Sequence, residues 1–85
     1  MLAYDPTTLN YLVQAGDLTR LVFGKVASES AVSGWALSKM LNRSPDDIEP
    51  VLAELRDKQL LDSDRQGLEG MYHLTQLGYL SRSFL

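Results

Sequence analysis

The amino-acid sequence predicts a single, mainly α-helical domain that carries one small β-hairpin. The chain has 85 residues, which is enough for one small domain and too few for two. Hydrophobic residues make up 45% of it, so the chain can bury a core. Apolar residues recur at helical spacing over most of the length, and two short apolar runs flank a glycine-containing stretch near residues 60–74.

Two helical segments are predicted before residue 30. In the first, Asp5 can cap a helix that begins with Pro6, where a missing backbone N–H costs nothing. Gly16 would end or bend this segment, and Asp17 would cap the second one. The second segment keeps apolar residues at helical spacing, namely Leu18, Leu21, Val22 and Val26.

A short strand and a third helix follow. Ala31 and Val32 would form the strand, and a helix would begin at Ser33 or Gly34 and continue to about residue 41. Asn42 suits the end of this helix because asparagine tolerates a left-handed backbone. We expect the large side chain of Trp35, at the start of this helix, to pack between the helix and the base of the hairpin.

The next helix lies within residues 44–59. Its apolar face consists of Ile48, Val51, Leu52 and Leu55. If Ser44 is the cap, Pro50 lies beyond the first turn and loses a backbone hydrogen bond. If Asp47 is the cap, Pro50 falls within the first turn and is tolerated. We therefore expect a loose turn at 44–46 and a regular helix that begins near Ile48 and ends near Gln59.

The hairpin is predicted at residues 60–63 and 71–74, where Gly67 and Gly70 permit positive φ in the connection. Alternation along the second strand places Tyr72 and Leu74 inward and Met71 and His73 outward. Thr75 would cap a closing helix. The resulting order of elements is that of a winged helix-turn-helix. We predict one domain over 1–85, with a helical extension at 1–16, a wing hairpin at 60–74 and a closing helix at 75–85.

Three stretches resemble winged-helix regulators of the PadR and MarR type. They are "SGWALSKML" (33–41), "SPDDIEPVLAELRDKQLL" (44–61) and "YHLTQLGYL" (72–80). The resemblance covers roughly residues 17–80. It implies a DNA-binding transcriptional regulator in which helix 44–59 approaches the major groove, and in which the terminal helices form a homodimer. Their order and spacing are typical of the fold but say little about the ligand.

Two sets of binding residues are predicted, the first from the cations around the helix-turn-helix and the second from large side chains on the terminal helices that exceed what one core can cover. Phosphate contacts on double-stranded DNA would come from Lys39, Arg43, Arg56, Lys58 and Arg65. The dimer or partner surface would use Tyr4, Tyr11, Leu12, Tyr79 and Phe84. The alternative for the cations is a solvated surface with ion pairs such as Glu54 with Lys58, which contribute only a few tenths of a kcal/mol, roughly.

The outer face of helix 44–59 departs from a typical DNA-reading helix. Where relatives carry groups that pair with bases or phosphates, this chain has Asp46, Asp47, Glu49, Pro50 and Ala53. The formal net charge of the chain is −3, which mildly repels a polyanion. We therefore expect weak, salt-sensitive DNA binding, or as an alternative a protein-interaction module whose acidic third helix docks a basic partner without nucleic acid. These carboxylates also suit a helix N-terminus for purely structural reasons.

Several classes of function find no support in the sequence. There are no cysteines, and His73 is the single histidine, so we expect no metal site and no cofactor. No catalytic arrangement or glycine-rich phosphate loop is present, and the chain is interpreted as a non-enzyme. No apolar run approaches the roughly 20 residues of a membrane span, and the N-terminus does not resemble a signal peptide. We expect a cytoplasmic protein that has no contact with a membrane.

Overall fold

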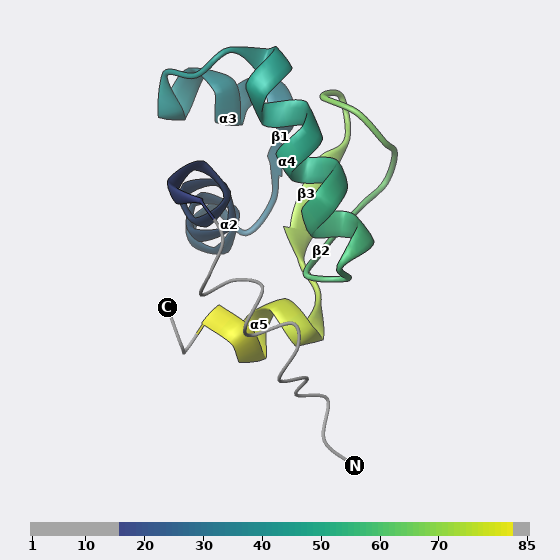
Figure 1. Ribbon diagram of the computed structural model, residues 1–85. Coiled ribbons are helices and arrows are strands. Elements are labelled where there is room, and N and C mark those ends of the chain that lie inside the picture. The colour runs from purple at the N-terminus through teal and green to yellow at the C-terminus, as the bar shows by residue number, and fades with distance from the viewer. Residues whose placement is uncertain (1–15, 83–85) are drawn as a thin grey trace.

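The computed structural model describes residues 16–82, which form four helices and a three-stranded antiparallel sheet (Figure 1). In chain order the elements are α2 (Asp17–Glu29), β1 (Val32–Ser33), α3 (Gly34–Leu41), α4 (Pro45–Asp57), β2 (Leu61–Ser63), β3 (Met71–Leu74) and α5 (Gln76–Arg82). The predicted class, mainly helical with a small hairpin, is confirmed. The arrangement is compatible with a winged helix. The predicted extension at 1–16 lies almost wholly outside the described residues.

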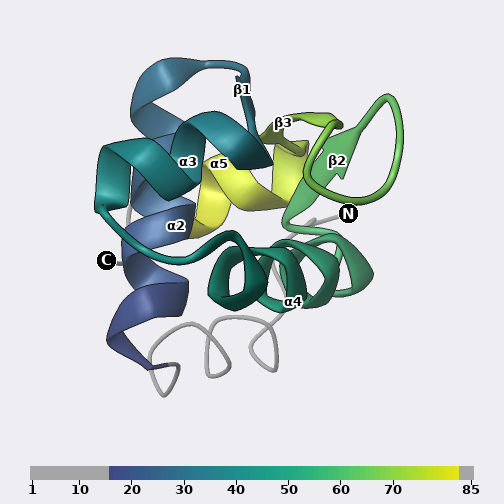
Figure 2. The ribbon, with the colours of Figure 1, turned by 90° about the horizontal axis from the view of Figure 1, so that it is seen from above.

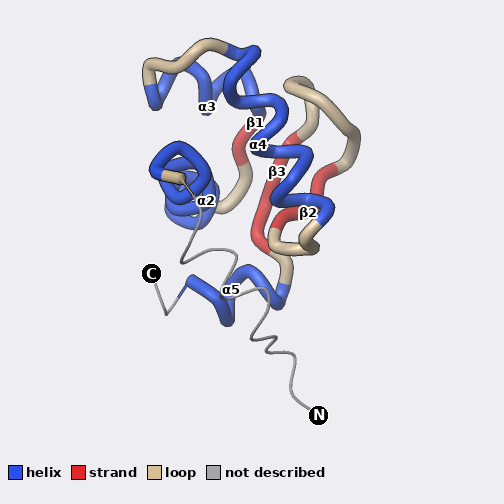
Figure 3. The backbone as a smooth tube through the Cα atoms, viewed as in Figure 1, coloured by secondary structure: helices blue, strands red, loops and turns tan. Residues whose placement is uncertain are grey.

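The hairpin is joined by the short strand that precedes α3, and the strand order is β1-β3-β2 (Figure 3). Val32 is paired with Tyr72 on one side of β3, and Leu61 with Leu74 on the other. The short strand therefore exists, one residue later than predicted. Along β3, Tyr72 and Leu74 are buried while Met71 and His73 are exposed, as the alternation predicted.

The core lies where α2, α4 and the sheet meet (Figure 2). Its fully or almost fully buried members are Val22, Phe23, Val26, Val32, Leu37, Ile48, Leu52, Leu55, Leu60, Leu61, Tyr72 and Leu74. Gly34 begins α3 at a close contact, because a Cβ there would lie 2.8 Å from the Leu68 Cα atom and 3.0 Å from Leu52 Cδ1. Close packing of α3 onto α4 and the wing therefore requires glycine at this position.

The expected loose turn at 44–46 is wrong, because α4 begins at Pro45. The Ser44 hydroxyl accepts a hydrogen bond from the Asp46 N–H at 3.2 Å, and proline suits the first helical position. Pro50 consequently lies inside the helix and cannot donate to the carbonyl four residues before it. Asp46 and Pro50 are both exposed, so water reaches this turn and lessens the penalty.

The end of α4 is also earlier than predicted. Gln59 has a positive φ of 64°, so the helix ends at Asp57. The Leu60 N–H donates to the Leu55 carbonyl at 3.0 Å, and the Gln59 N–H donates to the Arg56 carbonyl at 2.9 Å. This pair of bonds is a Schellman termination, formed here without the usual glycine. It turns the chain directly from α4 into β2.

Other local predictions had mixed outcomes. Gly16, not Asp17, occupies the capping position of α2, and it has no side chain to bond with. Asn42 does end α3 in a left-handed conformation, and the Thr75 hydroxyl does cap α5 by accepting from the Gly78 N–H at 3.0 Å. Gly67 has a positive φ, whereas Gly70 is needed for space, since a Cβ there would lie 2.1 Å from the Arg65 carbonyl oxygen.

Candidate interaction site

The apolar residues of α4 pack into the core, so its acidic residues face outward. Ile48, Leu52 and Leu55 are completely buried, and this fixes the rotation of the helix about its axis. The exposed residues of α4 are the five predicted for the outer face, Asp46, Asp47, Glu49, Pro50 and Ala53, together with Glu54 and Asp57. Asp46 and Asp47 lie in the first turn, where each carboxylate gains about 0.3–1 kcal/mol from the helix dipole.

The wing loop between β2 and β3 has a defined shape held by its own hydrogen bonds. The Asp64 carboxylate accepts from the Met71 N–H at 2.8 Å, and the buried Tyr72 hydroxyl donates to the Gly67 carbonyl at 2.9 Å. The bond from Met71 holds the pKa of the Asp64 carboxyl below its usual value. A Cβ on Gly67 would lie 3.5 Å from Glu49 Oε2, so the loop passes close to the outer face of α4.

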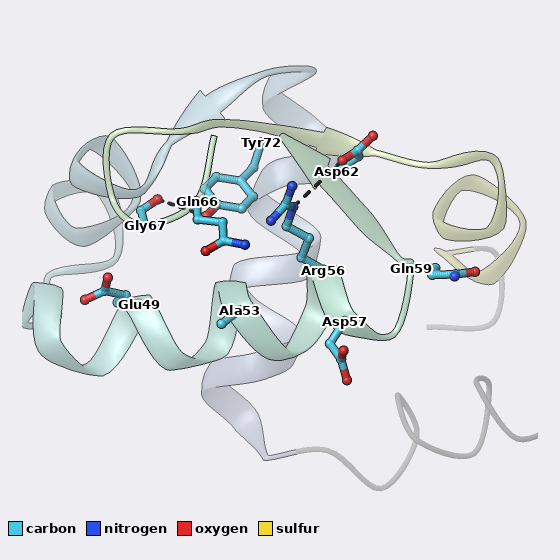
Figure 4. Close-up of a pocket in the computed structure, with 9 residues that line it drawn as sticks. All are labelled: Glu49, Ala53, Arg56, Asp57, Gln59, Asp62, Gln66, Gly67 and Tyr72. Atoms are coloured by element: carbon cyan, nitrogen blue, oxygen red, sulfur yellow. Dashed lines mark hydrogen bonds and ion pairs between the residues drawn. The ribbon is translucent and has the colours of Figure 1, made fainter. Parts of the chain in front are cut away.

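A groove of about 800 Å³ lies between α4 and the wing (Figure 4). Its lining consists of Glu49, Ala53, Arg56, Asp57, Gln59, Asp62, Gln66, Gly67 and Tyr72. Three of these residues are carboxylates and one is a guanidinium, which leaves a formal charge of −2. The guanidinium is itself engaged, since Arg56 Nε lies 3.9 Å from Asp62 Oδ1. The groove therefore presents negative charge, small side chains and amide groups to a ligand.

The five predicted phosphate contacts do not form one continuous positive stripe. Arg56 lines the acidic groove, and Arg65 Nε on the wing lies 3.8 Å from Asp64 Oδ2. Arg43 precedes the first turn of α4 and Lys58 follows its last turn, so the acidic outer face lies between them. Lys39 is exposed on α3. The carboxylates thus interrupt the surface that would follow a phosphate backbone.

The predicted dimer surface is described only in part. Tyr79 is 49% exposed on α5, next to the exposed Leu80. Tyr4, Tyr11, Leu12 and Phe84 lie outside the described residues. The homodimer remains a prediction.

The site offers no arrangement that would predict a reaction. Within residues 16–82, no three His, Asp or Glu side chains are grouped so that they could hold a metal ion. His73 is exposed on β3, away from the core. The groove is open and polar, which suits the binding of a charged chain segment better than the enclosure of a small substrate.

One surface was missed at the sequence level. Trp35, expected between α3 and the hairpin, is 50% exposed, and Met40 on the same helix is 46% exposed. The buried positions Gly34, Leu37 and Ser38 place both side chains on the outer half of the helix. The spacing of these small and apolar residues indicates which side of the helix faces the core. The prediction that Trp35 is buried relied instead on the size of its side chain.

Comparisons with known proteins do not assign the chain to a family, because no protein-family model matches it and no similar curated protein was found. The resemblance to PadR- and MarR-type regulators therefore stays a prediction. Among the helices of residues 16–82, none combines the length and the apolar character that crossing a membrane requires.

Proposed function

We propose that this chain is a winged-helix protein-interaction module that binds a basic segment of a partner protein in the groove between α4 and the wing. The observation that carries the proposal is the charge of the groove. The lining contains one cation, Arg56, and it is paired with Asp62. Glu49 and Asp57 therefore form no ion pair within the lining. An arginine or lysine side chain from a partner would supply the missing positive charge.

The groove favours arginine in particular. A guanidinium presents planar, paired N–H donors that match a carboxylate and can also donate to an amide oxygen. Carboxylates and the amides of Gln59 and Gln66 line the groove, while Ala53 and Gly67 leave room between them. The charged groups are near the surface, so binding should weaken as salt rises.

The same charges argue against nucleic acid in this groove. Neutralisation of phosphates by cations supplies most of the sequence-independent affinity for DNA. An α4 helix placed in a major groove would instead bring Asp46, Asp47 and Glu49 toward the phosphates. The charge of the outer face therefore favours a protein partner over a duplex.

The test is fluorescence anisotropy with a short labelled peptide of alternating arginine and serine, at low salt. Reversing two lining charges, Glu49→Lys with Asp57→Lys, should weaken binding by at least about tenfold. The matched control is Glu69→Lys, an exposed wing carboxylate that does not line the groove, and it should bind almost as the wild type does. No binding at about 100 µM protein, or equal weakening by the control, would reject the proposal.

A DNA-binding regulator is the second candidate, and one observation favours it. Lys39 and Arg43 are exposed near the α3–α4 turn, and neither forms an ion pair with any residue of the described part of the chain. Random duplex DNA at low salt tests it directly. Micromolar binding that salt reverses and that Arg43→Glu abolishes would establish this candidate. It would also replace the first if the arginine peptide fails to bind.

A further inference from the structure

The outer face of α3 carries two large apolar side chains that remain about half exposed. Trp35 is 50% exposed and Met40 is 46% exposed. At 100° per residue, Lys39 lies between them on the outer side of the helix. Figures 1 and 2 show α3 at the periphery of the domain, with α2 and α4 on its inner side.

The charge of this face is opposite to that of the groove. Residues 33–43 contain two cations, Lys39 and Arg43, and no carboxylate. Arg43 is held at the end of α3 by two hydrogen bonds: its N–H donates to the Ser38 carbonyl at 3.0 Å, and the Ser38 hydroxyl donates to its carbonyl at 2.5 Å. The backbone that carries the second cation is thus anchored to the helix.

We propose that the α3 face, defined by Trp35, Lys39, Met40 and Arg43, docks an acidic segment of a partner protein that also bears apolar side chains. Tryptophan, methionine and arginine are the residue types enriched in interface cores. The two cations would pair with carboxylates, and the tryptophan and methionine would lose their exposed area to apolar partner groups. This binding does not depend on the groove, because none of these four residues lines it.

A protein segment fits this face better than a duplex does. Phosphates would engage the two cations but would leave Trp35 and Met40 without an apolar partner. Asp46 and Asp47 follow closely after Arg43 in the chain and would repel a phosphate backbone that continued in that direction. The combination of apolar area with positive charge therefore identifies an acidic, partly apolar ligand.

The experiment uses the emission of Trp35, which is the single tryptophan of the chain. The full chain is titrated at low salt with a helical peptide of glutamate and leucine. A saturable shift of the emission to shorter wavelength is expected, because the peptide would remove the indole from water. Lys39→Glu and Arg43→Glu should each weaken binding by about tenfold, and Met40→Ser should weaken it less.

Two controls separate this site from other effects. Lys25→Glu makes the same charge change on α2, where Lys25 pairs with Glu29 at 4.0 Å, and should leave binding of the glutamate–leucine peptide unchanged. The paired groove substitutions Glu49→Lys and Asp57→Lys should also leave it unchanged, so failure of one site is distinguishable from failure of the other. Far-ultraviolet circular dichroism of each variant verifies that it is folded.

Three results would overturn the inference. The first is the absence of a shift at about 100 µM peptide. The second is an equal shift with duplex DNA that the peptide does not outcompete, which would assign the face to nucleic acid. The third is self-association of the peptide-free chain in light scattering, abolished by Met40→Ser, which would show that a second copy occupies the face.

Discussion

The outer faces of α3 and α4 have opposite charges although the two helices are adjacent in the chain and pack against each other. Only residues 42–44 separate them. Each inner face contributes completely buried leucines to the same core, Leu37 from α3 and Leu52 and Leu55 from α4. Outward, α3 presents Lys39 with a tryptophan and a methionine, and Arg43 follows in the turn after it, whereas α4 presents carboxylates with Pro50 and Ala53.

The fold and the surface chemistry are therefore set by different residues of the same helices. The core needs apolar side chains at helical spacing and accepts any polar residues on the other side. The outer residues can therefore differ in charge between neighbouring helices without a change in architecture. A winged-helix arrangement alone consequently does not identify the ligand, and the outer faces have to be compared directly.

The largest expected effects come from the inner faces, where the two helices should behave alike. Leu52→Ala and Leu37→Ala should each lower the free energy of unfolding by about 2–5 kcal/mol, because both side chains are completely buried. Urea denaturation measures the loss, and Ala53→Ser on the outer face should change stability by less than about 0.5 kcal/mol. If one of these substitutions left the free energy of unfolding unchanged, that helix would contribute less to the core than the other.

Pro50 offers a test on α4 that α3 lacks. Pro50→Ala restores a backbone N–H inside the helix and should raise the free energy of unfolding by about 1–3 kcal/mol. Ala53→Gly on the same exposed face should lower it by about 0.5–1 kcal/mol. Thermal unfolding followed by circular dichroism compares the two. A Pro50→Ala variant that is no more stable than the wild type would mean that packing has already compensated for the lost bond.

The N-terminal caps of α3 and α4 should stabilise the domain by different amounts. Ser33 accepts a hydrogen bond from the Ala36 N–H at 3.1 Å in a partly buried place, whereas the Ser44 bond is exposed. Ser33→Ala should therefore destabilise by about 1 kcal/mol. Ser44→Ala should cost about half as much, because Pro45 and the acidic first turn still favour the start of α4. The reverse order in denaturant titrations would contradict this view of the caps.

The smallest effect concerns the wing, which forms one side of the groove on α4. The folded-state pKa of Asp64 is below the ordinary 3.8, because the ionised carboxyl accepts the Met71 N–H. Its stabilisation is therefore complete above the unfolded pKa and is lost as pH falls through the folded value. Asp64→Asn should lower the melting temperature slightly near neutral pH, and the difference should vanish well below pH 3.8.

The same variant should affect binding at the two faces differently. Asp64→Asn should modestly weaken binding of the arginine–serine peptide, because the wing forms one side of the groove that binds it. It should not affect the glutamate–leucine peptide on α3. Equal loss at both faces would mean that the substitution disturbs the whole domain and not the wing alone.

Much of the fold could be predicted because its signals are local. Apolar spacing identified the buried positions of α4, alternation identified Tyr72 and Leu74, and Asn42 and Thr75 marked helix boundaries. The start of α4 was placed incorrectly because the penalty of Pro50 was weighed without the compensation from Ser44 and Pro45. Leu21 follows the helical spacing of apolar residues but is 49% exposed, whereas the nearby Phe23, which was not part of that pattern, is completely buried.

The composition of each surface follows from the sequence once the core is assigned, because the residues left over on an amphipathic helix must face outward. The sequence was therefore sufficient to predict an acidic α4. It was not sufficient to show that the wing approaches Glu49, that Arg56 is neutralised by Asp62, or that Trp35 is half exposed. These facts depend on contacts between different helices, strands and loops, and the periodicity within one element carries no information about such contacts.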